Sequence, residues 1–230
     1  MSDRPAIARI VVVVPAHDEE ELLTHCLASI ERARPQAGAP VDVVVALDDC
    51  HDGSSGIVRR FDALEVVLAA RAVGAARAAG VVAGLVLGDD DPAEVWIAST
   101  DADSVVPENW LRVQRELADA GADVVLGTVR PDPRDLTSAQ LAAWRATRVP
   151  GRPNGHVHGA NLGVRADAYA RAGGFAPLAE HEDVDLVARL RADPLVVLEA
   201  SDEADVLTSG RTTGRTPGGY ASYLRLAFPR

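Results

Sequence analysis

Short runs of apolar, mostly β-branched residues alternate along the chain with segments whose apolar residues recur at helical spacing. Each run is apolar on both faces, which is typical of a strand buried in a sheet. One of them, at 64–69, is expected at a sheet edge. The expected strands are 7–14, 41–47, 64–69, 94–100, 122–129 and 160–165, with two short ones near Leu195 and Val206.

The segments between these runs predict helices. Residues 18–34 open with four acidic residues, which suit a helix N-terminus, and continue with apolar residues three and four positions apart. Residues 72–87 are mostly small and predict a helix that packs closely on a sheet, while Pro107 suits the first turn of another helix. The remaining expected helices are 55–61, 107–121, 136–148, 183–192 and a short one near the C-terminus.

Alternating strands and helices predict parallel strands joined by right-handed crossovers, and therefore an α/β fold with an open, doubly wound sheet. A length of 230 residues fits a single domain, 1–230. Residues 130–158 interrupt the pattern with loops rich in Pro, Gly and Arg. Loops this long in a compact domain are usually functional or mobile.

The composition excludes several classes of protein. A hydrophobic content of 47% with 25% charged residues is globular, and a net charge of -11 argues against a non-specific nucleic-acid binder. Two Cys residues are too few for a disulfide framework or a zinc site. Because no stretch approaches the roughly 20 apolar residues that span a bilayer, we expect no integral membrane segment and a cytoplasmic location.

Three of the expected parallel strands end in acidic or polar segments, namely Pro15–Glu20, Leu47–Gly56 and Ser99–Ser104. Ligands of open α/β sheets bind beyond the carboxyl ends of the strands, so these segments are expected on one rim. The second segment, "LDDCHDGSSG", has residue types that suit a metal site, a redox site or a nucleotide pocket. The unpatterned cysteines weaken the redox interpretation.

The third segment contains the sequence "DADS", in which Asp101 and Asp103 share a face if the backbone is extended. Two adjacent carboxylates repel each other unless a cation or a donor offsets their charge, and Mg²⁺ or Mn²⁺ suits such oxygen ligands. The alternative is a solvated acidic turn that caps the helix near Pro107. The other two acidic strand ends favour the metal site.

Six segments follow one another in the order "VVVVPAHDEEELLTHCLASI", "VVVALDDCHDGSSG", "RAVGAARAAG", "STDADSVVPENWL", "GANLGVRADAYARAGGF" and "HEDVDLVARL". Together they resemble the GT-A nucleotide-sugar glycosyltransferases, most closely their family 2, from about Ile10 to Leu190. The resemblance implies a GT-A, Rossmann-like fold with a mixed, mostly parallel sheet. It also implies a nucleotide-binding part at about 1–128 and an acceptor-binding, catalytic part at about 129–230.

The resemblance assigns the first two rim segments to the nucleotide. Pro15, Ala16 and Glu19 match the loop that wraps the nucleoside, with an acidic residue near the ribose. Asp48 matches the aspartate that hydrogen-bonds the base. Asp18 stands where the family more often has Asn. Cys50 and His51 also depart from the family pattern, and we expect them to fill the loop rather than bind a metal.

The resemblance assigns the next segments to the diphosphate and the metal. Arg71 and Arg77 match a segment beside the nucleotide, where Arg77 offers donors to the diphosphate; the alternative is an Arg on a solvated helix face. Asp101 matches the residue that meets the ribose, and Asp103 matches the metal ligand. Some relatives add a late His as a metal ligand, but the last His here is His181.

The last segments are implied to hold the sugar and the acceptor. Gly159, Ala160 and Asn161 match that stretch. Arg211 and Arg215 lie in a Gly- and Thr-rich tail that suits a lid over the diphosphate, unless the tail is a frayed terminus.

Glu182 and Asp183 open a predicted helix whose apolar residues Val184, Val187 and Leu190 are expected to face inward. The position at the helix N-terminus favours ionised carboxylates. By the resemblance, Asp183 is the general base that deprotonates an acceptor hydroxyl, and Glu182 assists binding. The alternative is ordinary N-capping by an acid.

These observations predict an inverting, metal-dependent glycosyltransferase with Mn²⁺ or Mg²⁺ as cofactor. Its partners are expected to be a UDP-, GDP- or dTDP-linked sugar donor and an unknown hydroxyl acceptor, with no nucleic acid. Two alternatives stay open. A nucleotidyltransferase shares this sheet but needs a basic, Gly-rich loop after its first strand, where this chain has the acidic "PAHDEE". A non-catalytic homologue would bind nucleotide sugar without transferring it.

Overall fold

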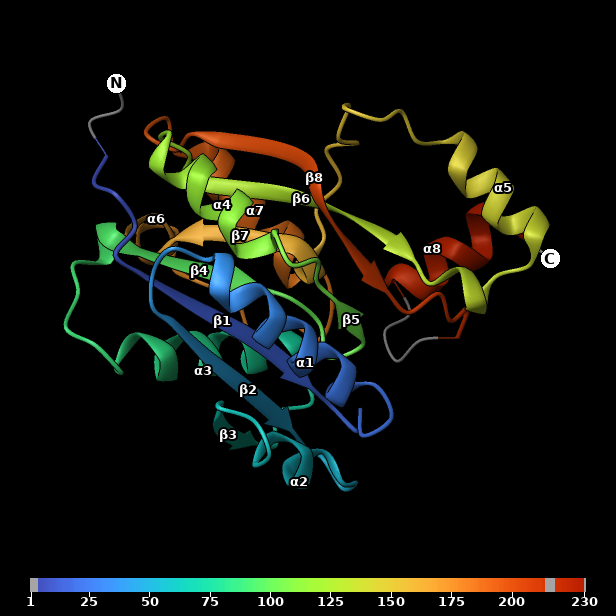
Figure 1. The fold of residues 1–230 in the computed structure, drawn as a ribbon, viewed down its shortest axis with the longest axis horizontal. Coiled ribbons are helices and arrows are strands. Elements are labelled where there is room, and N and C mark those ends of the chain that lie inside the picture. The colour runs from blue at the N-terminus through green and yellow to red at the C-terminus, as the bar shows by residue number, and fades with distance from the viewer. Residues whose placement is uncertain (1–3, 214–217, 230) are drawn as a thin grey trace.

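The computed structural model describes residues 4–213 and 218–229, which form an eight-stranded sheet flanked by helices (Figure 1). The strand order is β3-β2-β1-β4-β7-β6-β8-β5. The strands are β1 (Arg9–Ala16), β2 (Val41–Asp48), β3 (Leu64–Leu68), β4 (Val95–Ser99), β5 (Ser104–Val105), β6 (Val124–Pro131), β7 (Leu162–Arg165) and β8 (Leu198–Thr208).

The sheet is mixed and mostly parallel, as expected. Strands β3, β2, β1 and β4 pair in parallel, and so do β6 and β8. Strand β7 is antiparallel to both β4 and β6, and β5 is antiparallel to β8. Because β7 runs the opposite way, its first residue, Leu162, pairs with Ser99 at the end of β4. The segment that precedes β7 therefore lies at the rim where β1, β2 and β4 end.

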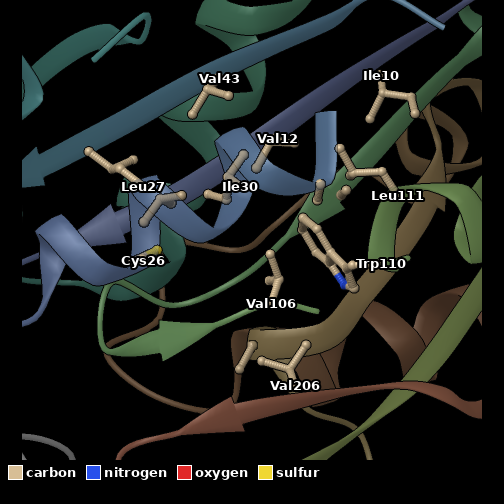
Figure 2. Close-up of a cluster of buried hydrophobic side chains, with 14 of the residues drawn as sticks. Ile10, Val12, Cys26, Leu27, Ile30, Val43, Val106, Trp110, Leu111 and Val206 are labelled. Carbon is tan, nitrogen blue, oxygen red and sulfur yellow. The ribbon is translucent and has the colours of Figure 1, made fainter. Parts of the chain in front are cut away.

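Both faces of the sheet are covered, because alternate strand residues point to opposite sides. Figure 2 shows the first cluster, in which Ile10 and Val12 of β1 pack against helices α1 and α4. The second cluster joins Val11 and Val13 of the same strand to helices α3, α6 and α7. The helices are α1 (Leu23–Ala33), α2 (Ser54–Val58), α3 (Val73–Leu85), α4 (Trp110–Asp119), α5 (Ser138–Ala146), α6 (Ala166–Arg171), α7 (Glu182–Ala192) and α8 (Tyr220–Ala227).

Helix α3 lies unusually close to the sheet, as its small residues predict. A Cβ atom on Gly80 would lie 2.6 Å from Cγ1 of Val13, and one on Gly84 would lie 2.2 Å from Cγ1 of Val11. Both distances are shorter than van der Waals contact. The two glycines therefore set the spacing between α3 and β1.

Three elements differ from the expectation. The acidic residues 18–21 lie in a loop, and α1 begins only at Leu23, because the backbone N–H and side chain of Glu20 bond Asp52 and Gly53 of the neighbouring loop. The strand expected near Leu195 is wrong, since that residue lies in a turn and is 72% exposed. A single strand, β8, replaces the two short ones, and its end pairs with β5, which the sequence did not predict.

Helices α5 and α8 lie together beyond the ends of β6 and β8, away from the other helices (Figure 1). The side chain of Gln140 in α5 donates a hydrogen bond to the Phe228 carbonyl after α8, with a distance of 2.8 Å. Among the described helices, none is long and apolar enough to cross a membrane.

Candidate active site

A cleft of about 1130 Å³ opens beyond the carboxyl ends of β1, β2 and β4. Asp48, Asp103 and Asp183 all line it, although they are far apart in the chain. The structure therefore brings the predicted acidic segments to one rim. The cleft is also lined by backbone in a strained conformation. Within residues 4–213 and 218–229, every non-glycine residue with a positive φ lines the cleft, namely Asp18, Asp49, Arg71 and His181. Strained backbone is characteristic of functional sites.

The first wall of the cleft consists of the loops after β1 and β2, which are bonded to each other. His17 Nδ1 lies 2.6 Å from the Asp48 carbonyl oxygen, and the Cys50 thiol donates to the Ala16 carbonyl. Asp18 accepts a bond from the backbone N–H of His51. Asp18, Cys50 and Asp52 lie close enough together to hold a metal ion, but their hydrogen bonds join the two loops. Cys50 thus links the two loops, whereas His51 is exposed and lines the cleft.

The Asp48 carboxylate holds the segment that leads into α3. It accepts bonds from the backbone N–H groups of Ala70, Arg71 and Ala72 at 2.7, 2.9 and 2.8 Å. Asp48 is buried, and three of its lone pairs are used in this way. One lone pair of the carboxylate remains for the predicted hydrogen bond to the base of the nucleotide.

Arg77 connects the carboxylates of two segments. Its guanidinium donates to Asp101 at 2.5 Å, to Glu182 at 2.8 Å and to the Gly159 carbonyl at 3.2 Å. It also donates to Ser99 at the end of β4. A Cβ on Gly159 would lie 2.4 Å from Arg77 Nη2, so only glycine leaves room for this side chain.

This arrangement corrects two expectations for Arg77, which is 2% exposed. It does not lie on a solvated helix face, and most of its donors are used by the protein rather than left for a diphosphate. Burial lowers the pKa of Arg77, but Asp101 and Glu182 raise it by more, so the group stays cationic. Arg77 fixes the positions of the two acidic segments relative to each other.

Asp103 lines the cleft beside the guanidinium of Arg211. Its carboxylate is 3.0 Å from Arg211 Nη2, which is also 3.1 Å from Glu19 Oε1. Burial and the nearby Asp101 raise the pKa of Asp103 to about 7. Ionised oxygen ligands that repel each other in this way fit a hard divalent cation. Arg215, the other predicted lid residue, lies outside the described residues.

Glu182 and Asp183 form the first turn of α7, as predicted. Glu182 is buried against Arg77, and burial raises its pKa. Asp183 instead faces the cleft, where its Oδ2 accepts the backbone N–H of Gly159 at 2.7 Å. The expectation that Val184 faces inward is wrong: it lines the cleft and is 47% exposed, while Leu186, Val187 and Leu190 form the buried face.

Asn161 lies under the rim and does not line the cleft, whereas Gly159 and Ala160 do. Its amide accepts bonds from Trp110 and Gln114 and donates to the carbonyls of Thr128 and Ala204. With its hydrogen-bonding groups used inside the core, its side chain cannot contact a sugar there. Asn161 therefore has a structural role in place of the predicted contact with the sugar or the acceptor.

The second wall of the cleft is aromatic, and the sequence interpretation missed it. Four side chains, His156, His158, Tyr220 and Tyr223, line this wall and contact one another. We call them the aromatic wall. The signal was present in the sequence, as two histidines two positions apart and two tyrosines at helical spacing.

A comparison with protein families identifies the chain. The family model "Glycosyl transferase family 2" matches residues 11–170, more than half of the sequence. The chain belongs to glycosyl transferase family 2. A curated relative, the undecaprenyl-phosphate 4-deoxy-4-formamido-L-arabinose transferase of Aeromonas hydrophila subsp. hydrophila, is 28% identical over 167 residues, which cover 72% of this chain and 50% of that protein.

Solved structures share the fold of this family 2 chain. S. aureus TarS 1-349 in complex with UDP-GlcNAc matches with a TM-score of 0.68 at 14% identity, over 95% of this chain and 65% of that one. The mannosyltransferase PcManGT from Pyrobaculum calidifontis, in complex with GDP-Man and Mn2+, matches with a TM-score of 0.66 at 20% identity, over 99% and 62%. The family 2 chain thus spans half of its curated relative and less than two thirds of either solved chain.

Proposed function

We propose that this family 2 chain transfers a sugar from a nucleoside diphosphate donor to an acceptor hydroxyl, with inversion at the anomeric carbon. The observation that supports it best is the shared cleft: Asp103, suited to a metal-bound diphosphate, and Asp183, suited to an acceptor hydroxyl, line the same space. Two structural relatives were solved with UDP-GlcNAc and with GDP-Man. We propose that the nucleoside binds between the loops that carry Pro15 and Asp48, which line the cleft.

Mn²⁺ or Mg²⁺ would be held by Asp103, with Asp101 beside it and the donor phosphates completing the shell. When bound, such a cation offsets the negative charge that develops on the leaving nucleoside diphosphate. The protein's own cation at this position is Arg211, which contacts Asp103 and Glu19. We propose that Arg211 moves from these carboxylates onto the diphosphate, in keeping with its predicted place in a lid.

Asp183 is proposed to accept the proton of the acceptor hydroxyl as that oxygen attacks the anomeric carbon. The bond from the anomeric carbon to the diphosphate oxygen breaks on the opposite face, and the nucleoside diphosphate leaves with that electron pair. The Gly159 N–H orients the Asp183 carboxylate, which lies in the first turn of α7. Glu182 positions Arg77 and, through it, Asp101.

The substitution Asp183→Asn tests this assignment. Asn has nearly the same shape as Asp, and its amide oxygen can still accept the hydrogen bond from the Gly159 N–H, but it cannot act as a general base. General base catalysis contributes about 10²–10⁴-fold, so turnover should fall by at least about 10²-fold while the affinity for the donor nucleotide is retained. Nucleoside diphosphate release measures turnover with an acceptor panel, and calorimetry measures affinity. Turnover near that of the wild type would remove Asp183 from this role, and release of pyrophosphate instead would indicate a nucleotidyltransferase.

A further inference from the structure

The aromatic wall is a concentration of rings in a chain that has few of them. Aromatic residues make up 4% of the sequence, and two of its three tyrosines lie here. The ring contacts close into a circuit: His156–His158 at 6.0 Å, His158–Tyr220 at 5.9 Å, Tyr220–Tyr223 at 5.8 Å and Tyr223–His156 at 6.4 Å between centroids. Two segments far apart in sequence, 156–158 and α8, therefore form one surface.

This surface adjoins the proposed base. His158 directly precedes Gly159, whose N–H bonds Asp183, and all of these residues line the same cleft. The surface is also uncharged at its inner side, because burial and the neighbouring His156 lower the pKa of His158 to about 4. A ligand on the aromatic wall would lie against these rings and present a hydroxyl to Asp183.

The charges around the wall argue against an anionic acceptor. Asp183 and Glu180 are acidic side chains of the same cleft lining, and Asp183 accepts the N–H of Gly159, next to His158. Every arginine in the described lining is already paired with a carboxylate: Arg71 with Asp49, Arg77 with Asp101 and Glu182, and Arg211 with Asp103 and Glu19. Arg148, behind the wall, is bonded to Asp205 and the Val129 carbonyl. A phosphate on the acceptor would thus meet carboxylates with no spare cation among the described lining residues.

We propose that the aromatic wall is the acceptor subsite and that it takes an uncharged pyranoside, whose C–H face lies against the rings. The proposal rests on the function proposed above and names its acceptor class. The electron-rich faces of aromatic rings attract the partly positive C–H groups of a sugar, and the contact removes apolar surface from water. A polyprenyl phosphate is the competing class, and the experiment below separates the two.

The test uses the full chain with Mn²⁺ and UDP or GDP, and ligand-observed saturation-transfer NMR. The probes are the methyl glycosides of glucose, mannose and N-acetylglucosamine, with geranyl phosphate as the lipid phosphate. At least one pyranoside should bind, with the strongest transfer to the protons of one ring face. Tyr223→Ala should weaken it by about fivefold to tenfold, a loss typical of one aromatic contact, whereas Tyr223→Phe should retain it.

Leu226→Ala is the matched control, because Leu226 lies on the same helix, is exposed and does not line the cleft. It should bind the pyranoside as the wild type does. Tighter binding of geranyl phosphate than of any pyranoside would overturn the proposal, and so would a lack of pyranoside binding or indifference to Tyr223→Ala. A titration of the wild type with sugar nucleotides tests the proposed function separately from the acceptor class. If no sugar nucleotide binds, the proposed function is contradicted. If a sugar nucleotide binds but no pyranoside does, only the acceptor class is contradicted.

Discussion

At the residue scale, Arg77 shows how one buried side chain organises the site. Its single guanidinium contacts Asp101 from the segment after β4, Glu182 from α7 and Gly159 from the segment before β7. Charges buried in this way are stable only as a hydrogen-bonded set, because each alone would have lost its water without compensation. Sequence reasoning found all of these residues but not the bonds among them, since a contact 105 positions apart leaves no local pattern.

The substitution Arg77→Met should therefore destabilise the fold. It keeps most of the volume but leaves Asp101 and Glu182 without their cation, and breaking a buried pair typically costs about 3–5 kcal/mol. The measurement is the free energy of unfolding from urea denaturation. Arg112→Ala is the control, since its pair with Glu116 is exposed on α4 and should contribute at most about 1 kcal/mol. Equal losses in the two variants would mean that Arg77 does not hold the site together.

At the element scale, the close contact between α3 and β1 depends on the absence of side chains. Gly84→Ala should lower the free energy of unfolding by about 1–3 kcal/mol, because the new methyl group overlaps the buried Val11. Gly56→Ala is the matched control: it lies inside α2 with no atom within 4 Å of the new Cβ. Ala should be neutral there or more stable by up to about 1 kcal/mol, from helix propensity. A tolerated Gly84→Ala would contradict the packing described for α3.

The same scale shows what the hydrophobic pattern can predict. Strands such as β1 and β2, buried on both faces, were found because their apolar runs are long and bounded by polar loops. The start of α1 was misplaced because acidic residues suit a helix N-terminus as well as a loop held by side-chain bonds. Only the end of β8, near Val206, was predicted, because its first half is largely exposed and polar, and β5 was missed because it has only two residues. Strands β5 and β8 are defined by the strands with which they pair, and not by a local sequence pattern.

At the scale of the whole molecule, the antiparallel course of β7 brings the segment before it to the rim where β1, β2 and β4 end. Because Leu162 pairs with Ser99, the Gly159–Asn161 turn meets the segment of Asp101 and Asp103. The order of the motifs along the chain predicted which residues gather at the rim. It did not predict that Asn161 turns into the core, nor that α8 completes a wall of the cleft.

The central claim is that this cleft binds a sugar nucleotide through a divalent cation held at Asp103. Calorimetric titration of UDP-, GDP- and dTDP-sugars, with Mn²⁺ and with chelator, tests it most directly. We expect at least one donor to bind more tightly with Mn²⁺ by about 5–150-fold, the usual range of coupling between two ligands. Asp103→Asn should abolish that difference, whereas Asp62→Asn, at an exposed carboxylate paired with Arg34, should keep it. Donor binding that is equal with Mn²⁺ and with chelator, or no binding of any donor, would contradict the account.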